Sequence, residues 1–215
     1  MVRIPRLLAI SDRTRLEGGE LGPWLDELAA DGVDAVQLRE RDLDDRAFYE
    51  LACETRRRLP ATIAVMVNRR LDVALGAGCQ GAHLATDAVH TGALRRRFGA
   101  EPILGVSTHS IDEIKRARDA GADFVTYGPL RPTPSKPGWV DVPGPTGIEK
   151  ASRHGIPLLV LGGVEDADDV TTAQSAGAAG VAGIRVFIDT DRRRRVVAAA
   201  RHAWPDSHSP SEAQP

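Results

Sequence analysis

The strongest chemical signal in this sequence is the stretch GPLRPTPSK at Gly128–Lys136. It follows directly on a short apolar run, and three prolines stiffen it. It offers the hydroxyl groups of Thr133 and Ser135, the ammonium group of Lys136 and the guanidinium group of Arg131. Hydroxyls, cations and backbone donors in a rigid loop suit a phosphorylated small molecule. The alternative is a solvated proline-rich turn, so the elements that position this loop must decide between the two.

Composition excludes several classes of protein. A net charge of -2 and an aromatic content of 4% provide neither a basic field nor a stacking surface, so we expect no nucleic acid partner. No apolar run approaches the length of a membrane span, so we expect no membrane partner either. Cys53 and Cys79 lack CxxC or metal-ligand spacing, and we interpret them as reduced thiols of a cytoplasmic protein.

A recurring glycine gives the chain its period. The pattern is a glycine after a helical segment, two further residues and then an apolar strand, and it recurs at intervals of 46, 43 and 56 residues, at Gly32, Gly78, Gly121 and Gly177. Such a glycine can close a helix in the left-handed conformation. A βα unit takes about 20 to 30 residues, so each interval holds two units.

Short apolar runs between turn residues are typical of parallel strands that are buried on both faces. We predict eight of them, at Leu7–Ser11, Ala35–Leu38, Thr62–Val67, Gly81–Leu84, Ile103–Ser107, Phe124–Gly128, Pro157–Leu161 and Gly180–Ile184. Helical patterns lie between them, as at Asp45–Leu59, Ile111–Ala120 and Asp189–Trp204.

Strict alternation of strand and helix predicts an α/β protein, a single (β/α)8 TIM barrel over residues 1–204. A doubly wound open sheet is less favoured, because no GxGxxG follows the first strand. We expect residues 205–215 to be a disordered polar tail.

The barrel indicates where a site would lie, because barrel active sites occupy the carboxyl ends of the strands. Loops after the seventh and eighth strands commonly bind phosphate through backbone N–H groups. This predicts phosphate-binding residues at Gly162, Gly163, Gly183, Ile184 and Arg185. Two alternatives are that the glycines only make tight turns and that Arg185 points outward.

A second cationic cluster is expected across the same mouth. Its cations come from three loops and are Arg39, Arg41, Arg69 and Lys136. The uncharged amides of Gln37 and Asn68 would orient a ligand, and Glu40 is the nearest carboxylate. The four arginines at Arg192–Arg195 fall inside the last helix, and we interpret them as a solvated face.

Seven sequence segments occur in the same order as in a known protein family. They are LLAISDR, VQLRER, VNRRLDVAL, GAHLATD, ILGVSTHS, GPLRPTPSKPG and LGGV. The series resembles the thiamine phosphate synthase and TenI superfamily from about Leu7 to Phe187. The resemblance implies a (β/α)8 barrel that acts in thiamine biosynthesis on a phosphorylated small molecule. It also implies a homo-oligomer, although the sequence shows no apolar interface stripe.

The resemblance implies roles for individual residues. In the synthase, residues like Gln37, Arg39, Asn68 and Lys136 hold the aminopyrimidine diphosphate, with Ser107 beside it, and Arg41 stands where lysine is usual. Residues like Thr133, Ser135, Gly163 and the pair Ile184–Arg185 hold the thiazole phosphate.

The chain departs from the synthase pattern at its metal site. Two aspartates there hold Mg²⁺ on the diphosphate, and their positions are Arg69 and Ala88 in this chain. Asp87, one place early, would be a metal ligand only in a synthase. We therefore expect no cofactor, or Mg²⁺ if the chain is a synthase.

TenI-type members move a proton on thiazole carboxylate phosphate without a metal. Their usual histidine corresponds to Pro129, so the catalytic acid or base would have to come from His83, His109 or Glu40. We expect His109 or Glu40, because a histidine at the position of His83 is more often a barrel-core residue. Three hypotheses follow. The first is a TenI-type enzyme, the second is a thiamine phosphate synthase, and the third is a non-catalytic binder of thiazole or thiamine phosphate.

Overall fold

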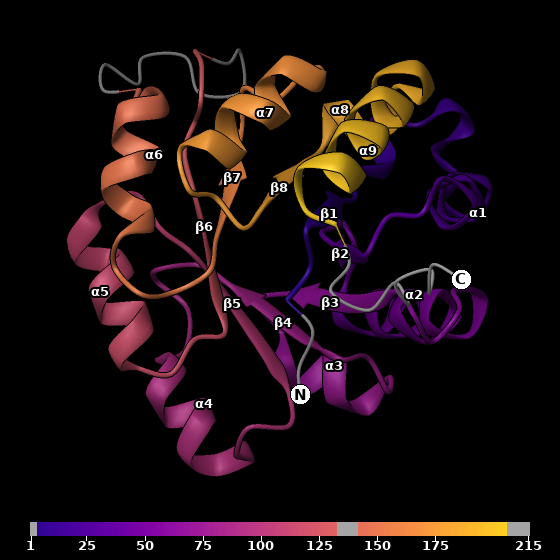
Figure 1. The fold of residues 1–215 in the computed structure, drawn as a ribbon. Coiled ribbons are helices and arrows are strands. Elements are labelled where there is room, and N and C mark those ends of the chain that lie inside the picture. Colours follow the sequence, from indigo (N-terminus) through magenta and orange to yellow (C-terminus); the bar gives the residue numbers. More distant parts are fainter. Residues whose placement is uncertain (1–3, 133–141, 206–215) are drawn as a thin grey trace, which may run out of the picture.

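The computed structural model describes residues 4–132 and 142–205, and Figure 1 shows how their elements are arranged. Within these residues, parallel strands pair in sequence order and β8 pairs with β1, which closes the barrel. The strands are β1 (Leu7–Ile10), β2 (Ala35–Leu38), β3 (Ala64–Asn68), β4 (Gly81–Leu84), β5 (Ile103–Ser107), β6 (Phe124–Tyr127), β7 (Leu158–Leu161) and β8 (Gly180–Gly183). The predicted (β/α)8 barrel is thereby confirmed.

Helices surround the strands (Figure 1). They are α1 (Leu21–Asp31), α2 (Asp45–Arg58), α3 (Leu71–Gly76), α4 (Thr91–Phe98), α5 (Ile111–Asp119), α6 (Gly144–Ser152), α7 (Ala167–Ser175), α8 (Arg185–Ile188) and α9 (Thr190–Ala203), with 3-10 turns η1 (Arg13–Arg15) and η2 (Glu17–Gly19). None of the helices in the described ranges is long and apolar enough to cross a membrane. Of the tail expected at 205–215, only Pro205 lies within the described residues.

The recurring glycines do what their spacing predicts. Gly32, Gly78, Gly121 and Gly177 have φ values between 70° and 85°. Gly32 is itself the cap of α1, and its N–H donates to the carbonyl oxygens of Leu28 and Ala29. A residue with a Cβ adopts this left-handed backbone at a cost, so glycine is favoured where each helix turns back toward the next strand.

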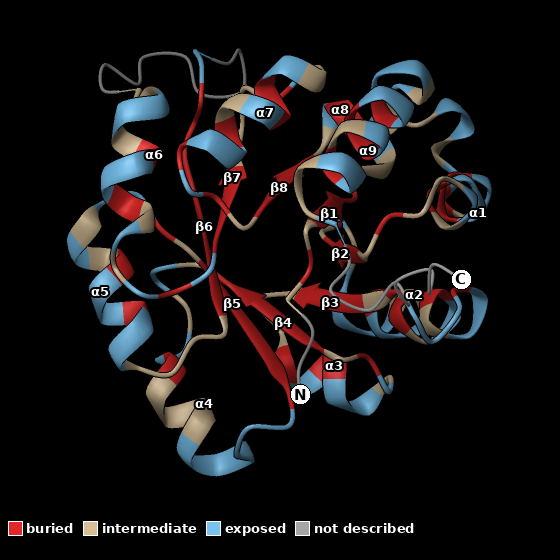
Figure 2. Cartoon of the chain, viewed as in Figure 1, coloured by how far each residue is buried: buried red, intermediate tan, exposed pale blue. Residues whose placement is uncertain are grey.

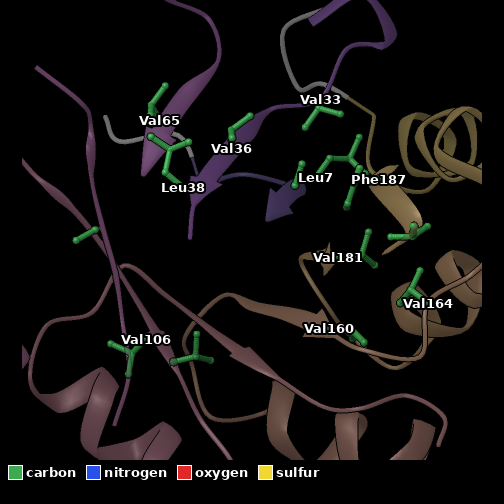
Figure 3. Packing of buried hydrophobic residues seen from close by; sticks show 14 of the residues in the cluster. Leu7, Val33, Val36, Leu38, Val65, Val106, Val160, Val164, Val181 and Phe187 are labelled. Atoms are coloured by element: carbon green, nitrogen blue, oxygen red, sulfur yellow. The ribbon is translucent and has the colours of Figure 1, made fainter. Parts of the chain in front are cut away.

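Alternation along each strand divides the core into two layers. Leu7 and Ala9 face the helices, whereas Leu8 and Ile10 face the barrel interior. Figure 2 shows the strands as buried and the outer faces of the helices as exposed. Figure 3 shows members of the outer layer, among them Val36, Val181 and Phe187. Because successive side chains point to opposite faces of a strand, the same alternation also aims polar residues inward near the carboxyl ends.

The third strand begins later than its apolar run predicts. Thr62 was expected to open it, but the strand starts at Ala64. The N–H of Ile63 donates to the carbonyl oxygen of Pro60 at 3.1 Å, which keeps this stretch in a turn. The shift leaves Asn68 as the last strand residue, opposite His83 of β4.

The interpretation of Arg192–Arg195 as a solvated face is wrong for one of the four. Arg192, Arg194 and Arg195 are exposed, but the side chain of Arg193 is fully buried. Its guanidinium donates to Asp31 and Glu27 of α1, at 2.6 Å each, and to the carbonyl oxygen of Phe187 at 3.0 Å. A fully buried guanidinium needs such partners, and here they tie the last helix to the first.

Candidate functional site

A cavity of about 800 Å³ opens at the carboxyl ends of the strands, and each of the eight strands contributes to its wall through its last residues or the connection that follows. Thirteen residues expected at the site line it, namely Gln37, Arg39, Glu40, Arg41, Asn68, Asp87, Ser107, His109, Gly162, Gly163, Gly183, Ile184 and Arg185. Thr133, Ser135 and Lys136 lie outside the described residues. The cavity has the size and place of a small-molecule site in a barrel enzyme.

Two amides meet at the cavity floor. Nε2 of Gln37 donates to Oδ1 of Asn68 at 3.0 Å, so strands β2 and β3 orient each other's side chains. Gln37 is only 2% exposed, and within the described part of the chain its Oε1 has no hydrogen-bond partner. A buried acceptor without a donor costs free energy. The Gln37 carbonyl group therefore suits a ligand that carries an N–H or O–H donor.

Two arginines from the β2 loop bring positive charge to the wall. Burial, and then the charge of Arg41, lowers the pKa of Arg39, while Asp12 and Glu40 act in the opposite direction. Among residues 4–132 and 142–205, the Arg39 guanidinium makes no hydrogen bond or ion pair with a side chain or backbone atom. Two neighbouring cations, one of them half-buried, would be stabilised by an anion in the cavity.

Glu40 connects two loops at the rim. Its side chain is 5% exposed and accepts hydrogen bonds from the Ser11 hydroxyl and, at 3.0 Å, from the N–H of Arg13. The Ser11 oxygen accepts in turn from the N–H of Arg39 at 2.9 Å. Both carboxylate oxygens are thus engaged within the protein, an arrangement that orients the Arg39 backbone and leaves Glu40 less suited to carry protons.

Arg69 and Asp87 form an ion pair at the edge of the cavity. NH1 of Arg69 lies 2.7 Å from Oδ1 of Asp87, and this hydrogen bond lowers the pKa of the carboxyl group. Among the described residues expected to bind substrate, Arg69 alone does not line the cavity. Arg69 has a φ of 64°, a conformation uncommon for a residue with a side chain. The carboxylate that could approach a metal is therefore paired with a cation from the protein.

His109 sits at the mouth with a carboxylate behind it. Nδ1 of its ring lies 3.3 Å from Oε2 of Glu113, and the same oxygen accepts from the His109 N–H at 2.6 Å. The side chain is 38% exposed and lines the cavity. A carboxylate beside one ring nitrogen orients the imidazole, which is how a general base is held in hydrolase triads.

His83 lies deeper in the same cavity. Its ring stacks on Phe124 with centroids 5.8 Å apart, and its Nε2 lies 3.3 Å from the Thr126 hydroxyl. Burial lowers the pKa of His83 to about 4, so the ring is neutral at physiological pH. Its stacking and burial agree with the expectation of a core histidine at the cavity floor.

The expected phosphate loops form one side of the wall. Gly162 and Gly163 have φ values of 97° and 74°, and Gly183 lies beside them at the end of β8. A Cβ on Gly183 would come within 2.7 Å of Val186. Without side chains, these turns leave backbone groups accessible from the cavity, as a phosphate site requires.

Sequence reasoning missed several residues of the wall. They include Thr14, Arg15, Asp42, Glu165 and Arg192. The 3-10 turn η1 folds the β1 loop over the mouth, and Arg192 reaches it from the first turn of α9. The run SDRTR follows the first strand, so its position could have suggested the first of these, but no local signal distinguishes Arg192 from the arginines that follow it.

Comparisons with known proteins agree with this geometry. The family model for thiamine monophosphate synthase matches residues 7–187. The chain is 39% identical to a "Putative thiamine-phosphate synthase" from Geobacter sulfurreducens, covering 88% of this chain and 90% of that one. It is 31% identical to a "Thiamine-phosphate synthase" from Caldanaerobacter subterraneus subsp. tengcongensis, with coverages of 86% and 87%. The solved thiamine phosphate pyrophosphorylase from Pyrococcus furiosus superposes with a TM-score of 0.77 at 26% identity, covering 92% and 94%.

Proposed function

Because the chain belongs to the thiamine monophosphate synthase family, we propose that it is a TenI-type enzyme that moves a proton on a thiazole phosphate without a divalent metal. The Arg69–Asp87 ion pair carries this proposal. In the synthase pattern, carboxylates stand at the positions of Arg69 and Ala88 and hold Mg²⁺ on a diphosphate. A guanidinium at the first of these positions neutralises Asp87 and repels a second cation.

The residues present do not fit a resident Mg²⁺. A hard divalent cation takes several oxygen ligands, with carboxylates prominent among them. Residues 4–132 and 142–205 contain no group of three His, Cys, Asp or Glu side chains placed to hold a metal ion. The nearest candidate, Asp87, is paired with Arg69. We therefore assign no step of the reaction to a metal.

The proposed chemistry needs one group that takes and returns a proton. His109 is suited to this task, because Glu113 orients its ring and the ring lines the cavity. The imidazole would accept a proton from one position of the substrate and return it at another, so that no proton is consumed. The turns at Gly162–Gly163 and Gly183 would bind the phosphate, and Gln37 would accept a hydrogen bond from the ligand.

A thiamine phosphate synthase is the second candidate, and a specific observation favours it. The half of the cavity that faces an aminopyrimidine diphosphate in the synthase is retained here. It has the Oε1 of Gln37, which lacks a hydrogen-bond partner among the described residues, the amide of Asn68 and the guanidinium of Arg39. In this alternative, arginines rather than a metal would stabilise the leaving diphosphate.

One assay separates the two candidates. The protein is incubated with thiazole carboxylate phosphate, with and without aminopyrimidine diphosphate, in Mg²⁺ or in EDTA, and both the thiazole isomer and thiamine phosphate are followed. We expect isomer conversion that is indifferent to Mg²⁺ and falls about a hundredfold in His109→Gln. The exposed His202 on α9 provides the control, and His202→Gln should leave the rate unchanged. Thiamine phosphate formation that requires Mg²⁺ would instead identify a synthase, and ligand binding without turnover would favour a binder.

Arg69→Asp tests the argument from the ion pair directly. The change removes the cation from Asp87 and sets a second carboxylate near it. We expect Mg²⁺ to bind the variant more tightly than the wild type in a calorimetric titration, and thiamine phosphate formation to appear or rise only when Mg²⁺ is present. Arg153→Asp is the control, because it makes the same change at an exposed pair with Glu149 that does not line the cavity. Equal Mg²⁺ affinities for wild type and Arg69→Asp would refute the role given to this pair.

A further inference from the structure

A buried carboxylate on α7 holds a cation from the segment after β6. Asp169 is 0% exposed, and its carboxylate forms an ion pair with the guanidinium of Arg131. Arg131 was expected to offer its charge to a phosphate, but it does not line the cavity. Its charge is instead directed toward Asp169 in the first turn of α7.

The same carboxylate also holds the chain between β7 and α7. Oδ2 of Asp169 accepts from the N–H of Glu165 at 2.8 Å and from the N–H of Asp166 at 3.3 Å. The start of α7 is already capped by Asp166, which accepts from the N–H of Asp169 at 3.1 Å. Asp169 is thus the N3 residue of a capping box with Asp166, which accounts for its Oδ2 but not for the pairing of its Oδ1 with Arg131.

The backbone beside Arg131 rests on the glycine turn of the site. The N–H of Leu130 donates to the carbonyl oxygen of Gly162 at 2.9 Å. A Cβ on Gly163 would lie 2.7 Å from the carbonyl oxygen of Arg131 and closer still to its amide nitrogen. The segment after β6 and the turn after β7 are thus in direct contact, with the Arg131–Asp169 pair at one end of that contact.

Burial of Asp169 gives this ion pair a desolvation cost. Removal from water disfavours the charged carboxyl group and raises its pKa, whereas the N–H donors and Arg131 act in the opposite direction. A charge buried at such a cost is retained where it gives two chain segments one defined arrangement. The segments joined here are the ones that form the glycine side of the cavity.

We propose that Arg131 and Asp169 are positioning residues for the phosphate group of the substrate. The pair holds the segment after β6 against the Gly162–Gly163 turn, so that backbone groups facing the cavity keep the spacing that a phosphate needs. This inference rests on the proposed function, because it takes that turn as the phosphate site. Neither side chain touches the substrate in this arrangement, and the guanidinium acts through the backbone that it fixes.

Ligand binding to Arg131→Gln tests the pair, since Arg131 is more than half exposed, its replacement leaves no cavity, and Asp169 keeps its two N–H donors. Thiazole phosphate, the unphosphorylated thiazole alcohol and inorganic phosphate are titrated calorimetrically into each protein. We expect the affinity of Arg131→Gln for thiazole phosphate and for inorganic phosphate to be about tenfold lower than that of the wild type, because small misplacements of binding groups are costly. The thiazole alcohol should bind equally to both proteins. Arg131→Lys, which keeps the charge, should recover part of the loss.

Two further variants separate positioning from general destabilisation. Asp169→Asn should lower the affinity for thiazole phosphate as Arg131→Gln does. The double variant should bind no more weakly than the weaker-binding single variant, because each single change already removes the same interaction. Arg118→Gln, which breaks an exposed pair with Asp119, should change nothing. Unchanged phosphate affinity in Arg131→Gln would overturn the inference.

The wild-type titrations distinguish a failed inference from a failed function. If the wild type binds inorganic phosphate but not thiazole phosphate, the proposed function fails, and the inorganic phosphate titrations still decide the role of the pair. If the wild type binds neither ligand, both proposals are overturned. An equal loss of phosphate and thiazole alcohol affinity in Arg131→Gln would show a general structural role and contradict positioning.

Discussion

Gly163→Asp is expected to abolish binding of phosphorylated ligands. Gly163 lines the cavity with a φ of 74°, and a Cβ there would press on the backbone of Arg131, which cannot move aside as a flexible side chain could. The variant would also set a carboxylate where the phosphate is expected, and two anions repel each other at this range. We expect affinity for thiazole phosphate to fall more than about a thousandfold, which corresponds to about 4 kcal/mol.

Calorimetric titration with thiazole phosphate measures the effect, and the chain offers a matched control. Gly155 has a similar φ of 71°, but a Cβ there would meet nothing within 4 Å. It precedes β7, at the opposite end of the barrel from the cavity. Gly155→Asp therefore introduces the same backbone strain and the same charge without touching the proposed site, and it should bind ligand normally. Normal binding by Gly163→Asp would mean that the phosphate lies elsewhere.

Arg193→Ala is expected to destabilise the fold more than any change to its neighbouring arginines. The buried guanidinium holds Asp31 and Glu27 of α1 and the carbonyl oxygen of Phe187. Burial tends to raise the pKa of Asp31, but hydrogen bonds from Arg193 and Arg194 hold it below its usual value. Removal of Arg193 leaves a space and a poorly compensated carboxylate. Breaking a buried pair in this way costs about 3–5 kcal/mol in the free energy of unfolding.

Urea unfolding followed by circular dichroism gives this free energy. Arg194→Ala is the control, because Arg194 is exposed and bonds the same Asp31 at 3.1 Å. An exposed pair contributes less than about 1 kcal/mol, so the two variants should differ by at least about 2 kcal/mol. Equal losses in the two variants would show that burial of Arg193 contributes little. Arg193→Ala should also loosen α8, because the Phe187 carbonyl oxygen would lose its hydrogen bond from Arg193 and keep the one from Trp24 Nε1, at 2.8 Å.

The barrel itself was predictable from local patterns. Short apolar runs placed all eight strands to within two residues, because a strand buried on both faces must be apolar throughout its length. The recurring glycines marked the returns from helix to strand, because a left-handed backbone favours a residue without Cβ. Parallel strands then bring their carboxyl ends together, so Gln37, Asn68 and Ser107 could be assigned to one mouth without coordinates.

The direction of individual charged side chains was not predictable in the same way. Glu40 was expected as a candidate proton carrier, and the structure shows it bridging Ser11 and Arg13. Arg69 was expected in the substrate site, but it pairs with Asp87 and does not itself line the cavity. Arg131 was expected to suit a phosphate, and it turns to Asp169 instead. Long side chains have many rotamers, so their direction depends on which partner the fold brings within reach.

The sequence alone determined the fold class, the strands and the end of the barrel where the polar residues gather, because each follows from a period of a few residues. The tertiary structure decided which charges pair. Four consecutive arginines are alike in sequence, yet only Arg193 is buried against α1, and its partner Asp31 lies 162 positions away in the chain. Successive helix residues point in different directions, and closure of the barrel selects the one that faces the first helix. No local pattern contains that information, because it arises only when the two ends of the chain meet.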